Sequence, residues 1–206
     1  MAKMKYLVIH CTDSPYTREI IPDDLWKWHL GPKKNSDGTF TFMSMRYDYE
    51  NMKDKYLKLP SGKKVKALSC GGRGWKQVGY SDLIQRSGNL INLVPYTFDD
   101  VINSYEITNG ASGYNSVSRH VVLAGGWSDP TCGDIIKNGI DPQTKKYFKP
   151  EVLYTPQQIE TLLTYIEMQV RIVPSLIIVG HNQLAAKTCP NFDVNQFLKD
   201  HKLLSK

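Results

Sequence analysis

Two histidines and a cysteine are the residues of this chain whose types and positions could together hold a metal ion. His10 directly follows the apolar run 7–9, and His181 directly follows a second apolar run at 177–180. Cys189 comes shortly after His181. Because sites in sheet proteins gather where strand ends open into loops, these nitrogen and sulfur donors can meet at one point. Such a set suits Zn²⁺, with the fourth position left to water.

Lys187 adds a positive charge beside the cysteine. Lys187 and Cys189 are two residues apart, so in an extended segment their side chains point to the same side. A zinc ion with an open position lowers the pKa of its bound water to about 7 and makes a nucleophile near neutral pH. The residue types therefore predict an open zinc site next to an ammonium group.

Apolar runs at strand and helix spacing must position these groups. We expect strands at residues 6–9, 80–85, 90–94, 120–124 and 176–179, the second and third forming a hairpin. We expect helices at residues 23–30, from Thr155 to about Pro174, from Asp193 through Leu198, and after Thr97, where Asp100 gives a pattern resembling a capping box. Hairpins combined with crossovers indicate an α/β fold: a single domain with a mixed central sheet flanked by helices.

The composition fits a globular protein. The chain has 206 residues, 41% hydrophobic and 22% charged, which excludes collagen-like, disulfide-scaffold and disordered classes. We expect one domain over residues 1–206, with an aromatic excursion at about 31–72 that holds one or two hairpins. No run reaches the ~20 apolar residues of a membrane span. The N-terminal apolar run is too short for a secretory signal, so we expect a cytoplasmic protein that acts elsewhere only after release.

The net charge of +6 favours polyanionic partners. The chain has no signature of a groove-reading helix or RNA-binding module, so no nucleic-acid partner is expected. The widely spaced cysteines form no CxxC pair, which favours free thiols over disulfides. We expect inert thiols at Cys11, Cys70 and Cys132 and structural roles for His29 and His120, and we expect His201 to be exposed to solvent.

Several segments together resemble a known enzyme family. They occur in this order: His10 after a strand, Gly74-Trp75, Val78-Gly79-Tyr80, Gly113-Tyr114-Asn115-Ser116, Leu123-Ala124-Gly125-Gly126, Tyr154-Thr155-Pro156-Gln157-Gln158, and Gly180-His181 with Ala186-Lys187-Thr188-Cys189-Pro190-Asn191-Phe192-Asp193. The chain resembles the zinc-dependent N-acetylmuramoyl-L-alanine amidases of the amidase-2 family, in particular the short phage lysozyme-type amidases, which share their fold with peptidoglycan recognition proteins. The resemblance covers the chain except about 31–72 and part of the loop near 128–150.

The resemblance implies a role for each matching residue. His10, His181 and Cys189 match the zinc ligands, Tyr80 matches a tyrosine beside the metal-bound water, and Lys187 matches the residue that stabilises the oxyanion. The implied reaction hydrolyses the amide between N-acetylmuramic acid and L-alanine in bacterial peptidoglycan, in phage or prophage lysis of the host cell.

The chain departs from the family pattern at two positions. Ser81 and Gly110 stand where relatives often have histidine, and His120 is a possible replacement. Three other functions stay open. They are a peptidoglycan-binding module without catalysis, a regulator that binds a viral RNA polymerase, and a zinc hydrolase of another amide.

Overall fold

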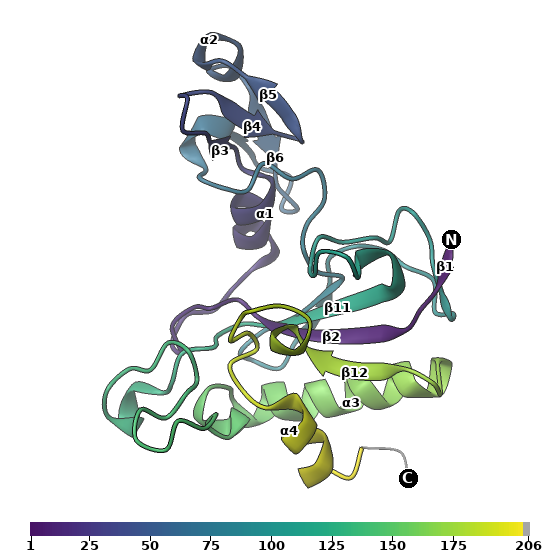
Figure 1. The fold of residues 1–206 in the computed structure, drawn as a ribbon. Coiled ribbons are helices and arrows are strands. Elements are labelled where there is room, and N and C mark those ends of the chain that lie inside the picture. The colour runs from purple at the N-terminus through teal and green to yellow at the C-terminus, as the bar shows by residue number, and fades with distance from the viewer. Residues whose placement is uncertain (204–206) are drawn as a thin grey trace. The chain divides into compact units, whose positions relative to one another are not determined.

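The computed structural model describes residues 1–203, apart from the side chain of Cys132 (Figure 1). The chain forms two compact units. The sheet unit consists of Met1–Glu19 and the chain from Tyr80 onward, and the inserted unit is Ile20–Gly79. The excursion expected at 31–72 lies within the inserted unit, which also takes in the preceding helix. The assignment of residues 1–206 to one catalytic domain stays a prediction.

A mixed five-stranded sheet forms the centre of the sheet unit, as predicted. Its strand order is β12-β2-β11-β8-β9. The strands are β2 (Tyr6–Cys11), β8 (Asp82–Ile84), β9 (Leu90–Asn92), β11 (Ser118–Leu123) and β12 (Ile177–Gly180). β12, β2, β11 and β8 run parallel, while β9 is antiparallel to β8 and completes the expected hairpin. The carboxyl ends of four strands therefore open at one edge.

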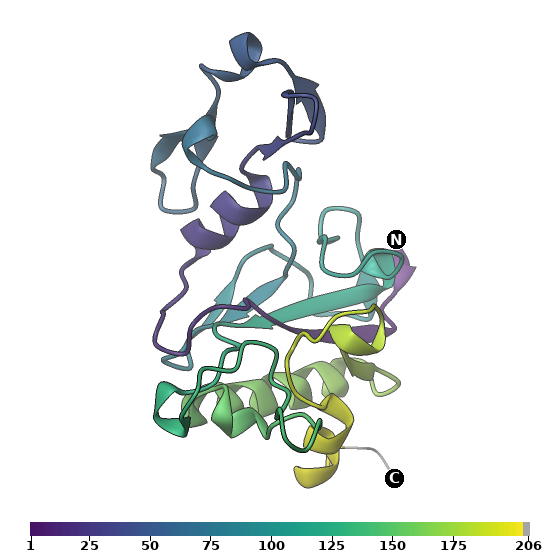
Figure 2. The same cartoon turned by 60° about the vertical axis from the view of Figure 1, so that its left-hand side comes forward.

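One face of this sheet packs against helices. α3 (Pro156–Ile172) and α4 (Val194–Asp200) lie on the same side of the sheet in both views (Figures 1 and 2). Leu7, Ile9 and Val121 belong to the core cluster with residues of both helices. Because side chains alternate along a strand, His10 and His120 point to the opposite face. The helices thus cover one face of the sheet, and His10 and His120 lie on the other face.

The predicted helix signals at Thr155 and Asp193 are confirmed. Thr155 Oγ1 accepts a hydrogen bond from the Gln158 N–H, and the Gln158 side chain accepts one from the Thr155 N–H, which completes a capping box. Asp193 caps α4 by accepting from the Gln196 N–H. Buried Gln158 also donates to the carbonyls of Ile84, in β8, and of Ala124, directly after β11, so the start of α3 is fixed to the sheet edge.

Thr155→Ala tests this anchor. The change removes the cap acceptor and the hydroxyl that donates to the Arg86 carbonyl at 2.7 Å. We expect the free energy of unfolding to fall by about 1–2 kcal/mol, as for other N-cap replacements. Urea denaturation measures the loss, and Thr164→Ala, on the same helix away from the cap, is the control. An equal loss in both variants would contradict a special role for the cap.

The helix predicted after Thr97 is wrong. Val101–Ile102 instead forms strand β10, which pairs antiparallel with β1 (Ala2–Lys3). The physical reason is Glu106, whose Oε1 accepts hydrogen bonds from both the N–H and the hydroxyl of Thr97. The threonine therefore anchors a loop rather than capping a helix.

The inserted unit contains two small antiparallel sheets beside a helix. Its elements are α1 (Pro22–Leu30), β3 (Lys33–Lys34), β4 (Phe40–Phe42), β5 (Met45–Tyr47), α2 (Tyr49–Met52), β6 (Tyr56–Lys58) and β7 (Lys64–Lys66). β4 pairs with β5 and β6 with β7, which confirms the expected hairpins. His29 is structural, as expected: its Nδ1 accepts from the Gly79 N–H and its ring stacks on Trp75.

Short 3₁₀ turns complete the chain. They are η1 (Ala67–Ser69), η2 (Asn115–Val117), η3 (Pro130–Cys132), η4 (Pro150–Val152) and η5 (His181–Gln183). Within residues 1–203, no helix combines the length and apolar character needed to cross a membrane.

Candidate metal centre

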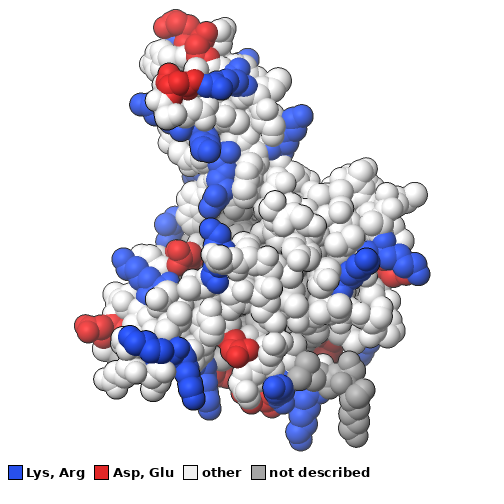
Figure 3. Space-filling model, viewed as in Figure 1, with Lys and Arg blue, Asp and Glu red and all other residues white. Residues whose placement is uncertain are grey.

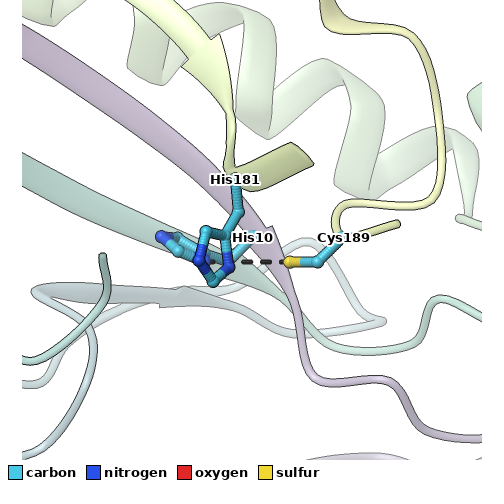
Figure 4. Close-up of side chains that lie close together, drawn as sticks. All are labelled: His10, His181 and Cys189. Carbon is cyan, nitrogen blue, oxygen red and sulfur yellow. Dashed lines mark hydrogen bonds between the residues drawn. The ribbon is translucent and has the colours of Figure 1, made fainter. Parts of the chain in front are cut away.

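The structure brings His10, His181 and Cys189 together at the carboxyl edge of the sheet (Figure 4). One donor atom from each lies within 4.8 Å of the others. The His10 Nδ1 and the Cys189 Sγ are 3.7 Å apart. Ligands about 2.0–2.3 Å from one tetrahedral zinc ion lie roughly 3.5 Å from each other. Two imidazoles and a thiol at this spacing therefore fit Zn²⁺, with room for one further ligand.

The sheet register explains why the two histidines meet. His10 is the fifth residue of β2, and His181 directly follows β12. These strands are parallel neighbours in which Gly180 pairs with Ile9, so both histidines reach the same end of adjacent strands. Their ring centroids are 4.7 Å apart.

Cys189 lies in a turn rather than at the end of a strand. After His181 the chain makes the 3₁₀ turn η5, Lys187 and Thr188 belong to no helix, strand or turn, and Cys189 begins a further turn. The Asn182 N–H donates to the Cys189 carbonyl at 2.7 Å. This hydrogen bond brings Cys189 close to the residue that follows His181. The Cys11 N–H donates to the Cys189 Sγ at 3.2 Å. Backbone contacts thus hold the sulfur in place.

The protonation of Cys189 depends on what it binds. Burial, followed by the neighbouring Cys11 thiol, raises the pKa of the Cys189 thiol well above its usual value. The metal-free protein therefore holds it protonated. A bound dication favours the thiolate and releases this proton, so the donor set gains its charge only with a metal.

His120 contacts the candidate ligand His10 from the neighbouring strand β11. The His10 Nε2 and the His120 Nδ1 are 3.0 Å apart in a buried hydrogen bond. Burial, with a smaller effect of His181, lowers the pKa of His120 to about 3, so its ring is neutral. His120 Nδ1 can then accept the Nε2 proton of His10 and leave the His10 Nδ1 lone pair facing Cys189. A hydrogen bond of this kind fixes the tautomer of a metal-binding histidine.

His120→Ala is expected to weaken zinc binding by roughly 10–100-fold, the usual effect of removing such a support. Competition with a zinc-chelating dye measures the affinity, and the melting temperature of the metal-free variant accounts for the cavity. His120→Gln, whose side-chain oxygen accepts the same proton, should recover part of the affinity. Unchanged zinc affinity in His120→Ala would show that His10 needs no support.

The structure also relates Tyr80 and Lys187 to this cluster. The half-buried Tyr80 ring has its centroid 5.0 Å from that of His10. Lys187 is exposed, and its charge lowers the pKa of His181, although burial contributes more. Ser81 is buried beside His120: its N–H donates to the His120 carbonyl, and its hydroxyl accepts from the His120 N–H. His120, considered as a replacement for the family histidine, thus contacts the candidate ligand His10.

A depression of about 660 Å³ is lined by residues close in the chain to His10 and Cys189, but not by the candidate ligands themselves. Its lining includes Asp13, which follows β2, and Thr188, which precedes Cys189. The remaining lining residues come from the long loop before α3: Ile136, Lys137, Asn138, Ile140, Pro142 and Lys145. This size suits a small ligand or a segment of a larger one.

Neither Cys11 nor Cys70 belongs to the described donor cluster, although the Cys11 backbone contacts the Cys189 sulfur. Cys11 and Cys70 are buried free thiols, as expected. The expectation of an inert thiol at Cys132 lies outside the described side chains. Sequence reasoning treated His120 as an interior residue and undervalued it. The signal in the sequence was an imidazole directly before the apolar run 121–124.

Comparison with known proteins gives related sequences and similar folds. No protein-family profile matches the chain. It is 29% identical to an endolysin of Enterobacteria phage K11 and 25% identical to the endolysin of Escherichia phage T7. Each match extends over 133 residues, 65% of this chain and 72% of the relative.

Two solved structures share the fold over nearly the whole chain. One is N-acetylmuramoyl-L-alanine amidase LysC from Clostridium intestinale, with a TM-score of 0.52 at 14% identity. The other is the endolysin of Thermus scotoductus bacteriophage Ph2119, with a TM-score of 0.50 at 16% identity. Each match covers 97% of this chain, and 86% and 85% of those chains respectively.

The chain is thus similar in sequence to phage endolysins and shares its fold with an N-acetylmuramoyl-L-alanine amidase and a phage endolysin.

Proposed function

We propose that this protein is a zinc-dependent phage endolysin that hydrolyses the amide between N-acetylmuramic acid and L-alanine in bacterial peptidoglycan. The observation that carries the proposal is the convergence of His10, His181 and Cys189 at one edge of the sheet. The endolysin relatives and the amidase fold support the same reaction class.

The donor set determines what a bound metal can contribute. His10, His181 and Cys189 would hold Zn²⁺ and leave one position for water or substrate oxygen. Zinc bound there would act as a Lewis acid and would lower the pKa of a bound water. His120 keeps the His10 Nδ1 lone pair directed at this point through the 3.0 Å hydrogen bond.

Lys187 and Tyr80 would act on the reacting amide. Hydrolysis develops negative charge on the carbonyl oxygen, and the Lys187 ammonium group stabilises that charge electrostatically. A proton must also leave the attacking water and reach the departing amine of L-alanine. The Tyr80 hydroxyl would orient or relay this proton beside His10. The depression at Asp13 and Thr188 would receive part of the substrate next to the scissile bond.

Mass spectrometry of the products tests the reaction. Purified peptidoglycan is incubated with the protein, with and without a zinc chelator. We expect free stem peptides that begin at L-alanine, and we expect them to disappear on chelation and return when zinc is restored. Peptidoglycan that is bound but remains uncut, with zinc supplied and walls of several chemotypes tested, would instead support a binding module or a regulatory protein.

A further inference from the structure

The net charge of the chain lies in one of its two units. The inserted unit, Ile20–Gly79, has twelve Lys and Arg against six Asp and Glu, a net charge of +6. The rest of the chain has fourteen of each, so the sheet unit together with the three C-terminal residues is neutral. Figure 3 shows basic side chains spread over the inserted unit. The excess charge is therefore a property of the insertion.

The β6–β7 hairpin gathers part of this charge on one face. In its register Lys58 pairs with Lys64, and Tyr56 pairs with Lys66. All four of these side chains are exposed, whereas Leu57 on the other face is buried. We call the residues Tyr56, Lys58, Lys64 and Lys66 the lysine face. It presents three ammonium groups and one aromatic ring side by side.

Lys58 and Lys64 of the lysine face stand directly opposite each other in the hairpin. Directly opposite residues in a β-hairpin have Cβ atoms about 4.5–5.5 Å apart, and like charges there destabilise the pairing. Across residues 1–203, no ion pair links Lys58, Lys64 or Lys66 to a carboxylate. A negatively charged partner would remove this repulsion, so binding and hairpin stability are linked.

Hydrogen bonds hold the hairpin at both ends. At the tip, the Asp23 carboxylate of α1 accepts from the Ser61 N–H at 3.0 Å and from the Ser61 hydroxyl at 2.7 Å. At the base, the Ala67 N–H donates to the Lys55 carbonyl at 2.8 Å. The lysine face is thus arranged before any partner binds, which lowers the entropic cost of binding.

We propose that the lysine face binds the peptidoglycan polymer as a second contact, separate from the metal centre. The inference rests on the proposed function, which makes peptidoglycan the substrate. Each repeat of this polymer offers sugar rings, which suit the Tyr56 ring, and stem-peptide carboxylates, which suit the lysines. A second contact keeps the enzyme near uncut amides by raising their effective concentration.

Cosedimentation with insoluble peptidoglycan sacculi, stripped of attached polymers, tests the lysine face. The test protein is the full chain with Lys58→Gln, Lys64→Gln and Lys66→Gln. The matched control has the same loss of charge in the sheet unit, through Lys5→Gln, Lys199→Gln and Lys202→Gln. Binding is measured in the cold over a salt series, and the supernatant is monitored for released fragments. Hydrolysis of a soluble muropeptide is measured in parallel.

We expect the hairpin triple variant to bind sacculi about tenfold more weakly at low salt and with a flatter salt dependence, because fewer charge contacts form. The control should change less than twofold, and both variants should cleave the soluble muropeptide normally. The hairpin variant should melt at the same or a higher temperature, because the Lys58–Lys64 repulsion is gone. Tyr56→Ala should weaken binding without changing the salt slope.

Equal losses in the hairpin variant and the control would overturn the proposal, since net charge alone would then explain binding. Unchanged sacculus binding in the hairpin triple variant would overturn the proposal too. If that variant also lost binding to duplex DNA while the control kept it, the lysine face would be a nucleic-acid contact instead. Failure of every variant to cleave the soluble muropeptide would contradict the proposed function instead, while the sacculus measurements would still decide the lysine face.

Discussion

Cys189→Ala is expected to abolish both metal retention and amide hydrolysis. The change leaves two histidines, His10 and His181, and removes the donor that supplies negative charge to the site. Zinc held by two neutral imidazoles alone dissociates easily, and without zinc the attacking water returns to its ordinary pKa of about 15.7. We expect the rate of muropeptide cleavage to fall by on the order of 10³-fold or more. Metal content after gel filtration and product formation measure the two losses.

Two further variants make this result specific. Cys70→Ala removes another buried free thiol, in the inserted unit, and should leave zinc content and activity unchanged. Cys189→Asp restores a negatively charged ligand and should recover part of the zinc binding, since carboxylate oxygens also bind zinc. Stoichiometric zinc and full activity in Cys189→Ala would show that the metal lies elsewhere, and the proposed reaction would lose its main support.

Local patterns along the chain predicted much of the fold. Short apolar runs predicted the strands of the mixed sheet, and the Thr155–Gln158 capping box predicted the start of α3. Such signals act over a few residues and are visible in one segment. Thr97 shows where this fails: the same type of signal anchors a loop there, because Glu106 accepts its hydrogen bonds. The competing partner follows nine residues later, beyond the reach of a capping pattern.

In the candidate site too, some features follow from short segments of the sequence and others from residues far apart in the chain. Residue types and order identified the ligands His10, His181 and Cys189 as candidates, because two of them mark strand ends. The support from His120 depends on strand β11 lying directly beside β2, a neighbour relation that no single segment contains. The charge of each unit can be counted from the sequence once the boundaries of the unit are known. Identifying the lysine face also requires the β6–β7 register.

Lys187→Ala separates catalysis from metal binding. Lys187 is exposed and contributes no donor atom to the cluster, so the variant should retain zinc. It loses the positive charge that we place beside the developing oxyanion, and one such group contributes on the order of 10²–10³-fold to kcat. We therefore expect a loss of that size in kcat with little change in KM. Steady-state cleavage of a soluble muropeptide measures both constants.

A second measurement on the same variant tests the placement of the charge rather than its role. In the metal-free protein, burial is the larger cause of the lowered His181 pKa and the Lys187 charge is the smaller one. Without the lysine, only burial remains, so the pKa of His181 should rise partway toward its ordinary value. Titration of the imidazole resonances by NMR gives this shift. Lys187→Arg, which keeps the charge, should show neither the full loss of kcat nor the shift. If Lys187→Ala has a normal kcat but a shifted His181 pKa, then Lys187 lies close to His181 and another group stabilises the oxyanion.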